Sequence, residues 1–320
     1  MPTNPFPGAP VKRSTPYLVL LGGVLVVASA SIMIRGAQQL GMPSGTIAAL
    51  RLGFAALVLL PLALLRARAE LFGLSRRELL LGMGAGACLA VHFFAWISSL
   101  EYTSVASSVA LVTSSPLWLA LAAWLMRERL GRMTWLGVLC TMAGSVIIGY
   151  SDGSGGNARN ALLGDALALL GAIAVAGYFL VGRTLQRRLS TLAYVALVYT
   201  SSAVFLVLLA LLAGGGVAAF VGFPAWAYLL ALLLGLGPQL LGHTALNWSL
   251  RHLSPTFVAV ATLGEPIGSA LLALLIFGQS FAPLQLVGFV ILLAGILIAA
   301  RGERASAPAG ETLGVPALAE

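Results

Sequence analysis

The sequence predicts an all-α membrane protein whose ten transmembrane helices form two inverted five-helix repeats. Hydrophobic residues make up 59% of the 320 residues and charged residues 9%, whereas soluble domains hold about 45–50% and about 25%. The apolar residues lie in long runs separated by basic clusters, and the two halves of the chain resemble each other. So little charge cannot keep a protein of this size in water. The composition therefore excludes a soluble enzyme and a disordered chain.

Ten apolar runs approach the length of about 20 residues that a membrane helix needs. They are 17–35, 44–65, 79–100, 104–126, 133–150, 161–182, 191–213, 225–250, 254–277 and 282–300. The first run could be mistaken for a signal peptide, since Ala28-Ser29-Ala30 resembles a cleavage site. The apolar run continues past that point and has a counterpart later in the chain. We therefore interpret it as the first span.

The distribution of Lys and Arg predicts the orientation. With the N-terminus inside, Arg35 and Arg159 are outside and Arg51 lies within the second run. The inner segments then hold fifteen basic residues: Lys12, Arg13, Arg66, Arg68, Arg76, Arg77, Arg127, Arg129, Arg132, Arg183, Arg187, Arg188, Arg251, Arg301 and Arg304. This asymmetry follows the positive-inside rule and predicts that both termini are cytoplasmic. The net charge of +8 comes from these clusters, which suit an anionic membrane face and not nucleic acid.

The second half of the chain repeats the first at an offset of about 150 residues. Leu100-Glu-Tyr-Thr-Ser104 matches Leu250-Arg-His-Leu-Ser254, and Pro116 matches Pro266. Arg35 and Gln38 match Arg183 and Gln186, while Gly137 and Gly144 match Gly288 and Gly295. Five is an odd number, so the second copy enters the membrane from the opposite face. The predicted units are a cytoplasmic tail 1–16, a first repeat 17–150, a periplasmic linker 151–160, a second repeat 161–301 and a disordered cytoplasmic tail 302–320.

Two stretches resemble the EamA family of the drug/metabolite transporter superfamily. The first runs from Ser98-Ser-Leu-Glu-Tyr-Thr-Ser104 through Ser115-Pro116 to Glu128-Arg129-Leu130, and the second from Leu253-Ser-Pro-Thr256 through Gly264-Glu265-Pro266. The family pattern also has an acidic residue at the end of the fourth helix. At the matching position the second copy reads Phe277-Gly278-Gln279 and lacks this acid. The resemblance implies transport of small metabolites, amino acids or related compounds across a bacterial-type inner membrane, mostly outward.

Glu265 is the first candidate functional residue, because it is the one acid deep within a predicted span. A charge at that depth is costly, so the carboxyl group should be neutralised, paired or facing water. Pro266 cannot donate to the carbonyl of Thr262, which frees an acceptor nearby and predicts a helix kink, as does Pro116. Glu265 could therefore carry a coupling proton or bind a cationic group. The alternative is a protonated, purely structural side chain that bonds a neighbouring helix.

His92 and Trp96 share one helix face at spacing i, i+4, and His243 and Asn247 repeat that spacing. His243 falls on Phe93 in the repeat alignment, so we expect these faces to meet near the pseudo-twofold axis. Aromatic walls with few polar groups are typical of a small-molecule cavity. Tyr178 is a further cavity candidate. The alternative for the His and Asn side chains is hydrogen bonding between helices.

Arg51 lies within the outer half of the second run, and we expect its side chain to extend outward to the interface. Otherwise it could attract an anionic group of the substrate.

The leading hypothesis is a secondary active exporter that lies in the lipid bilayer. It moves a small-molecule substrate across the membrane by alternating access. A passive facilitator or channel is the alternative, and a membrane-embedded enzyme is a weaker one. The sequence shows no Walker motif, metal-ligand pattern or nucleophile arrangement, so we predict no catalytic residue, metal or cofactor. Ten helices can enclose a cavity without a partner, which favours a monomer.

Overall fold

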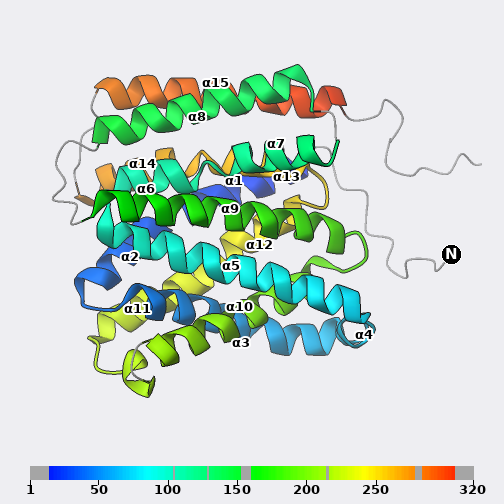
Figure 1. Cartoon of the computed structure of the whole chain (residues 1–320), viewed down its shortest axis with the longest axis vertical. Coiled ribbons are helices and arrows are strands. Elements are labelled where there is room, and N and C mark those ends of the chain that lie inside the picture. The colour runs from blue at the N-terminus through cyan, green and yellow to red at the C-terminus, as the bar shows by residue number, and fades with distance from the viewer. Residues whose placement is uncertain are drawn as a thin grey trace, which may run out of the picture.

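The computed structural model describes residues 14–103, 105–127, 130–152, 160–213, 216–277 and 283–306. Within these ranges the chain is helical and contains no strand (Figure 1). The first half contains α1 (Thr15–Val27), α2 (Ala30–Gln39), α3 (Ser44–Arg66), α4 (Arg68–Phe72), α5 (Arg76–Tyr102), α6 (Val105–Val112), α7 (Ser115–Leu125) and α8 (Arg132–Asp152). The second half contains α9 (Ala161–Leu185), α10 (Thr191–Ala213), the 3₁₀ turn η1 (Gly216–Phe220), α11 (Ala225–Leu234), the π-helical segment η2 (Gly235–His243), α12 (Thr244–Ser249), α13 (Pro255–Thr262), α14 (Glu265–Phe277) and α15 (Pro283–Ser306).

Each of the ten predicted runs contains one helix or several consecutive helices. Two-residue breaks separate α1 from α2, α6 from α7 and α13 from α14, while η2 joins α11 to α12. Six helical segments of the described chain are long and apolar enough to cross a membrane: Thr15–Gln39, Ser44–Arg66, Arg76–Tyr102, Leu162–Leu185, Thr191–Ala213 and Ala225–Ser249. Ser115–Leu125, Arg132–Ile147 and Leu286–Ala299 are apolar but shorter. The structure thus supports a multi-pass membrane protein, and the number of ten spans stays a prediction.

The ends of several helices differ from the predicted boundaries. α15 continues to Ser306, so the expectation of a disordered tail from residue 302 does not hold for residues 302–306. Gly302 packs against the start of α8, where an added Cβ would lie 2.8 Å from Thr134 Oγ1, and this contact supports the last turns of the helix. Residues 1–13, Ser104, Glu128-Arg129, residues 153–159, Gly278-Gln279 and residues 307–320 lie outside the described residues.

The two halves pack as an inverted pair. The second helices of the halves, α3 and α10, contact each other, and so do the fifth helices, α8 and α15. The third helix of one half contacts the first helix of the other in both directions, as α5 with α9 and as η2 and α12 with α1. α1 and α9 run in opposite directions (Figure 1). This exchange of equivalent contacts is the arrangement that a pseudo-twofold axis in the membrane plane produces.

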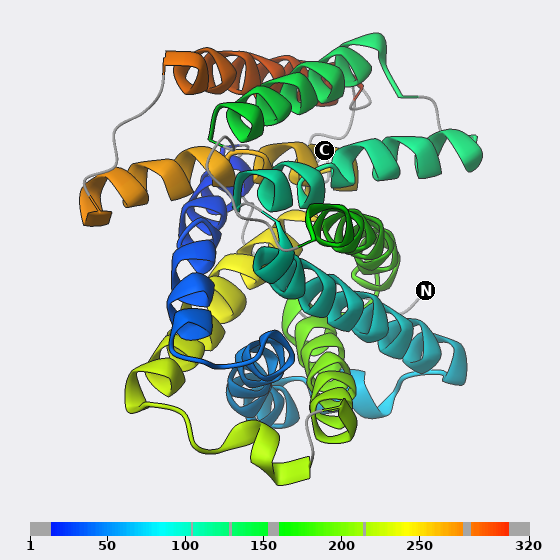
Figure 2. The same cartoon turned by 60° about the vertical axis from the view of Figure 1, so that its left-hand side comes forward.

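The contact between α8 and α15 depends on glycines, and the two helices lie side by side at one edge of the bundle (Figure 2). A Cβ added to Gly144 would lie 2.6 Å from the backbone N of Leu292, and one added to Gly295 would lie 2.5 Å from the backbone N of Thr141. Gly144 and Gly295 are counterparts in the repeat, as are Thr141 and Leu292. Small residues let membrane helices approach closely where no hydrophobic force drives them together.

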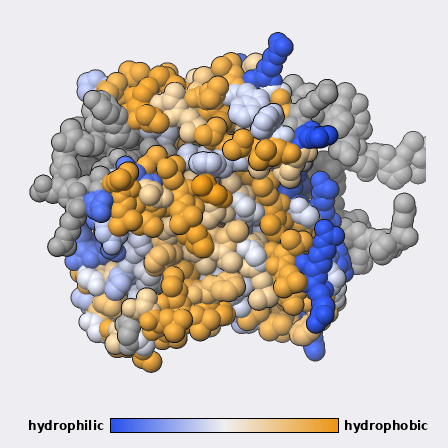
Figure 3. All heavy atoms as spheres, in the orientation of Figure 1, coloured by the Kyte–Doolittle hydropathy of each residue, from blue (hydrophilic) through white to orange (hydrophobic). Residues whose placement is uncertain are grey.

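The surface has an apolar belt between two polar ends (Figure 3). Leucines such as Leu65 and Leu212 are more than four-fifths exposed, which only a lipid environment tolerates over so large an area. One polar end lies where α4 and the end of α15 are found (Figures 1 and 3), and it is basic, since Arg66, Arg68, Arg76 and Arg77 lie in or beside α4. There Arg188 forms an ion pair with Glu78, and the backbone N–H of Ser190 donates to Glu70 across 2.5 Å.

Candidate functional site

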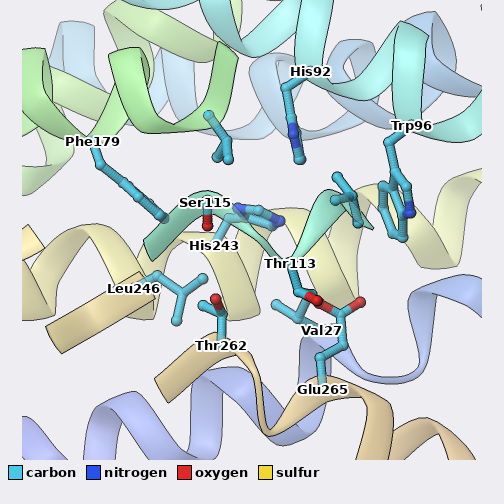
Figure 4. A pocket seen from close by; sticks show the side chains of 12 residues that line it. Val27, His92, Trp96, Thr113, Ser115, Phe179, His243, Leu246, Thr262 and Glu265 are labelled. Atoms are coloured by element: carbon cyan, nitrogen blue, oxygen red, sulfur yellow. The ribbon is translucent and has the colours of Figure 1, made fainter. Parts of the chain in front are cut away.

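A central cavity lies where the two halves meet, and α1, α5, α9, η2 and the two broken helices α6–α7 and α13–α14 contribute to it (Figure 4). About 40 Å³ of it is accessible to water, which is room for about three or four molecules at roughly 10–15 Å³ each. Apolar and polar side chains line it in equal number, six of each: Val27, His92, Trp96, Val112, Thr113, Ser115, Val175, Phe179, His243, Leu246, Thr262 and Glu265.

Two broken helices bring their new N-termini to this cavity. α7 begins at Ser115 after the break at Thr113–Ser114, and α14 begins at Glu265 after the break at Leu263–Gly264. Pro116 and Pro266 were predicted to kink continuous helices. Instead each lies in the first turn of the second half-helix, where its missing N–H has no intrahelical acceptor to lose. The half-helices α7 and α14 extend from the centre in opposite directions (Figure 2). Ser115 and Glu265 are repeat counterparts, so both halves supply the same position to the cavity.

His92 and Trp96 reach the cavity from α5, as their i, i+4 spacing predicted that they would share one face. The His92 Nδ1–H donates to the Gly171 carbonyl across 2.9 Å. Because a carbonyl can only accept, this bond assigns the proton to Nδ1 and leaves Nε2 of the neutral ring as an acceptor. The two rings stack with centroids 6.0 Å apart. Trp96 Nε1 has no hydrogen-bond partner in the described structure.

Glu265 enters from the opposite side (Figure 4). Its side chain is 8% exposed, and its Oε1 finds no hydrogen-bond partner among the described residues. The N-terminus of α14 carries a partial positive charge that favours a carboxylate at this position. Glu265 and Arg51 also interact electrostatically. The site therefore contains an acidic group that is buried, aimed at the cavity and not held by an ion pair in the described chain.

His243 lines the cavity from η2, and its ring meets the Phe93 ring edge-on with centroids 5.2 Å apart. Its Nδ1 has no partner in the described part of the chain. Tyr178 and Asn247, the other two predicted residues, do not line the cavity. They are completely buried behind His243.

Asn247 and Tyr178 belong to a polar layer between helices. Asn247 Nδ2 donates to the His243 carbonyl across 2.7 Å and to the Tyr199 hydroxyl across 3.2 Å. Tyr178 interacts with both Tyr199 and Asn247, and its ring stacks on Tyr194 with centroids 6.3 Å apart. For Asn247 the structure thus shows the alternative, helix–helix hydrogen bonding.

The expectation for Arg51 was wrong. Its side chain does not reach the interface but is 0% exposed inside the bundle. Its Nε donates to Gln239 Oε1 across 2.9 Å, and its guanidinium carbon lies 4.0 Å from the centroid of the Phe93 ring. Snorkelling requires a side chain that starts on the lipid face, and α3 turns Arg51 toward η2. The sequence analysis did not identify Gln239 as a functional candidate. A polar residue beside Pro238 within an apolar run could have indicated it.

No group of three or more His, Cys, Asp or Glu side chains that could hold a metal ion occurs in the described ranges. The site offers aromatic surface, two imidazoles, a carboxyl group and hydroxyls, which suit binding of a small polar organic molecule.

Comparison with known proteins gives the family and the fold. Residues 14–150 and 162–301 each match the EamA-like transporter family. A solved crystal structure of another protein aligns with a TM-score of 0.74 at 20% identity, over 92% of this chain and 99% of that one. That likeness shows the fold alone. No curated protein matches the sequence. Because the family match covers both halves, one repeat in each, this protein belongs to the EamA-like transporter family.

Proposed function

We propose that this transporter is a secondary active exporter of small organic metabolites such as amino acids or related compounds, and that it works by alternating access. The observation that carries this proposal is the position of the cavity. It lies where the inverted halves meet, between two helices that break at equivalent positions, 113–114 and 263–264. Substrate sites formed by broken helices at the midplane of inverted repeats are the arrangement through which one site opens alternately to each side.

Hydrogen bonds and an ion pair that join helices near the two ends of the bundle support a carrier mechanism in this proposal. Arg188 pairs with Glu78 at the basic end, and at the other end Gln38 Nε2 donates to Ser44 Oγ across 2.9 Å while Ser44 bonds Glu101. Alternate release of these two sets of contacts would open the cavity to each side in turn.

The chemistry of the lining supports a small organic substrate with polar groups. His92 and Trp96 supply an aromatic wall, and Glu265 supplies an acidic group that could bind a proton or a cationic group. A proton on Glu265 could couple substrate movement to the proton gradient. The basic end of the bundle is the cytoplasmic end in this proposal, because positively charged segments resist translocation across an inner membrane.

Counterflow in proteoliposomes tests the mechanism. Labelled amino acids, nucleosides and amines are first screened for uptake, and a compound that moves is then loaded unlabelled on the opposite side. An alternating carrier exchanges substrate between the two sides faster than it moves substrate in one direction only. Unlabelled substrate on the opposite side should therefore accelerate labelled flux severalfold. A flux that rises linearly with concentration and ignores the opposite side would instead show a facilitator or channel. A conversion of the compound without net movement would show a membrane enzyme.

A further inference from the structure

A second polar site lies behind the cavity and is separate from its lining. We call it the inner polar cluster, and it consists of Arg51 of α3, Tyr199 of α10 and Gln239 of η2, with Tyr178 and Asn247 beside them. All five side chains are 0% exposed. Phe93 lies between this cluster and the cavity, with the Arg51 guanidinium over its ring and His243 against its edge.

The cluster has more hydrogen-bond donors than acceptors. Arg51 uses Nε on Gln239, but neither its Nη1 nor its Nη2 has a partner among the described residues. Gln239 Nε2 is without a partner in the same set. These three nitrogens carry six N–H groups, whereas the cluster's unpaired acceptors among the described residues are Asn247 Oδ1 and the Tyr178 hydroxyl oxygen. The acid that interacts electrostatically with Arg51 is Glu265, which belongs to the cavity and not to the cluster.

The backbones of α3 and η2 approach each other closely at this cluster. Gly235 at the start of η2 lies against α3, where an added Cβ would be 2.9 Å from the Arg51 carbonyl and 2.8 Å from Phe54 Cβ. The π-helical turn that follows contains Pro238 and presents Gln239 to Arg51. Long π-helical segments are rare, and short ones occur frequently at functional sites. Burying a guanidinium without an anionic partner lowers the stability of the folded protein. An anionic ligand that binds Arg51 would offset this cost.

We propose that Arg51 and Gln239 bind the anionic group of the transported molecule, a carboxylate or a similar planar oxyanion. Nη1 and Nη2 of Arg51 form the two-pronged donor that matches two oxygens, and Gln239 Nε2 adds a third donor. The Phe93 ring must swing aside or the helices must separate for the anion to reach them. This proposal rests on the proposed transport function and adds to it a substrate class, namely organic acids and zwitterions.

Ligand-induced thermal stabilisation of the purified full-length protein tests the site. The probes are the twenty L-amino acids, acetate, succinate, chloride and inorganic phosphate, and for each carboxylate that binds, its carboxamide. We expect at least one carboxylate to raise the unfolding temperature, and its carboxamide to bind at least tenfold more weakly. The Arg51→Lys variant keeps the charge but loses the paired geometry, so it should weaken binding at least tenfold. Arg51→Met should abolish it.

Arg35→Gln is the matched control, since Arg35 is a second arginine in the first half whose Nη1 already donates to the Leu100 carbonyl. It should leave carboxylate binding unchanged. Without ligand, Arg51→Met should unfold at the same temperature as the unmodified protein or higher, because it removes an uncompensated buried charge. A structural arginine would give the opposite result, a lower unfolding temperature.

Several results would overturn the proposal. They include no stabilisation of the unmodified protein by any anion of the panel, binding that survives in Arg51→Met, and equal binding of acid and carboxamide. Strong thermodynamic coupling between Arg51→Met and Glu265→Gln in the empty protein would also overturn it, since Glu265 would then be the partner of Arg51. Flux assays separate this failure from failure of the transport function. If no carboxylate binds but a neutral compound is still transported, the anion site is refuted and the transport function stands, whereas Arg51-dependent binding without flux refutes transport alone.

Discussion

Phe93 and His243 are counterparts in the two halves of the sequence, and in the structure their rings touch, with centroids 5.2 Å apart and planes at 76°. Equivalent positions of two repeats can contact each other only near the axis that relates them. The pair therefore marks the pseudo-twofold axis. One member carries an imidazole that lines the cavity, and the other carries a phenyl ring that covers Arg51. The two halves share a backbone plan but differ in chemistry where they meet.

A bulky side chain in the cavity should block transport without preventing folding. Val175 of α9 lines the cavity and is buried, while Ile173 of the same helix is 46% exposed. Val175→Trp should fill the small space and reduce substrate flux at least tenfold, at a stability cost of about 1–3 kcal/mol. Ile173→Trp is the matched control and should keep normal flux. Initial rates in proteoliposomes at equal protein density check this, and normal flux in Val175→Trp would place the substrate path elsewhere.

Glu265→Gln should change how transport depends on pH. The variant keeps the shape of the side chain and removes its charge, while Arg51, His92 and His243 still face the region. If Glu265 carries the coupling proton, uphill proton-driven flux should fall at least tenfold while exchange of substrate between both sides continues. If it binds a cationic group of the substrate, both activities should fall together.

The Glu265 experiment has a matched control in Asp165→Asn, which changes a carboxyl group that bonds Thr103 away from the cavity. This variant should retain the original pH profile. Flux is measured between pH 5.5 and 8.5 for the three proteins. A Glu265→Gln protein that folds and transports with an unchanged profile would show that Glu265 is structural.

Topology can be tested with single cysteines in a background where Cys88 and Cys140 are replaced by alanine. The positive-inside asymmetry predicts that Gly155 is periplasmic and that Ser190 is cytoplasmic. A membrane-impermeant maleimide added to intact cells should label Gly155→Cys and leave Ser190→Cys unmodified until the cells are permeabilised. Labelling of both from outside would contradict the predicted topology. Labelling of Ser190→Cys alone would show that the orientation is reversed.

The glycines of α8 and α15 should be equally sensitive to substitution. An added methyl group at Gly144 or Gly295 meets backbone at 2.6 Å or 2.5 Å, so the helices must separate. Gly144→Ala and Gly295→Ala should each lower the free energy of unfolding by about 1–3 kcal/mol. Gly84→Ala is the control, because nothing lies within 4 Å of its added Cβ. It should be neutral or stabilising by about 0.5–1 kcal/mol, the usual preference for Ala in a helix. Thermal unfolding in detergent measures all three, and unequal effects at Gly144 and Gly295 would contradict the symmetric contact.

The sequence by itself determined the helices, the repeat and the family. Hydropathy indicates whether a segment can lie in lipid. Gly144 matches Gly295 and Pro116 matches Pro266 because equivalent positions in two halves of the same fold meet the same structural requirements. The spacing of His92 and Trp96 placed them on one helix face, and the depth of Glu265 marked it as costly. These are local properties of a segment, so no neighbouring helix is needed to recognise them.

Only the tertiary structure decided which way the polar residues inside the spans face. Membrane helices are apolar on all sides, so periodicity does not reveal the face that turns inward. For this reason the sequence could not tell that Arg51 is buried against Gln239 and Phe93, or that Asn247 bonds a helix behind the cavity. Likewise, a proline predicts disruption of a helix. Whether Pro266 kinks a continuous helix or begins a new one depends on the packing around Leu263 and Gly264, which the other half of the molecule supplies.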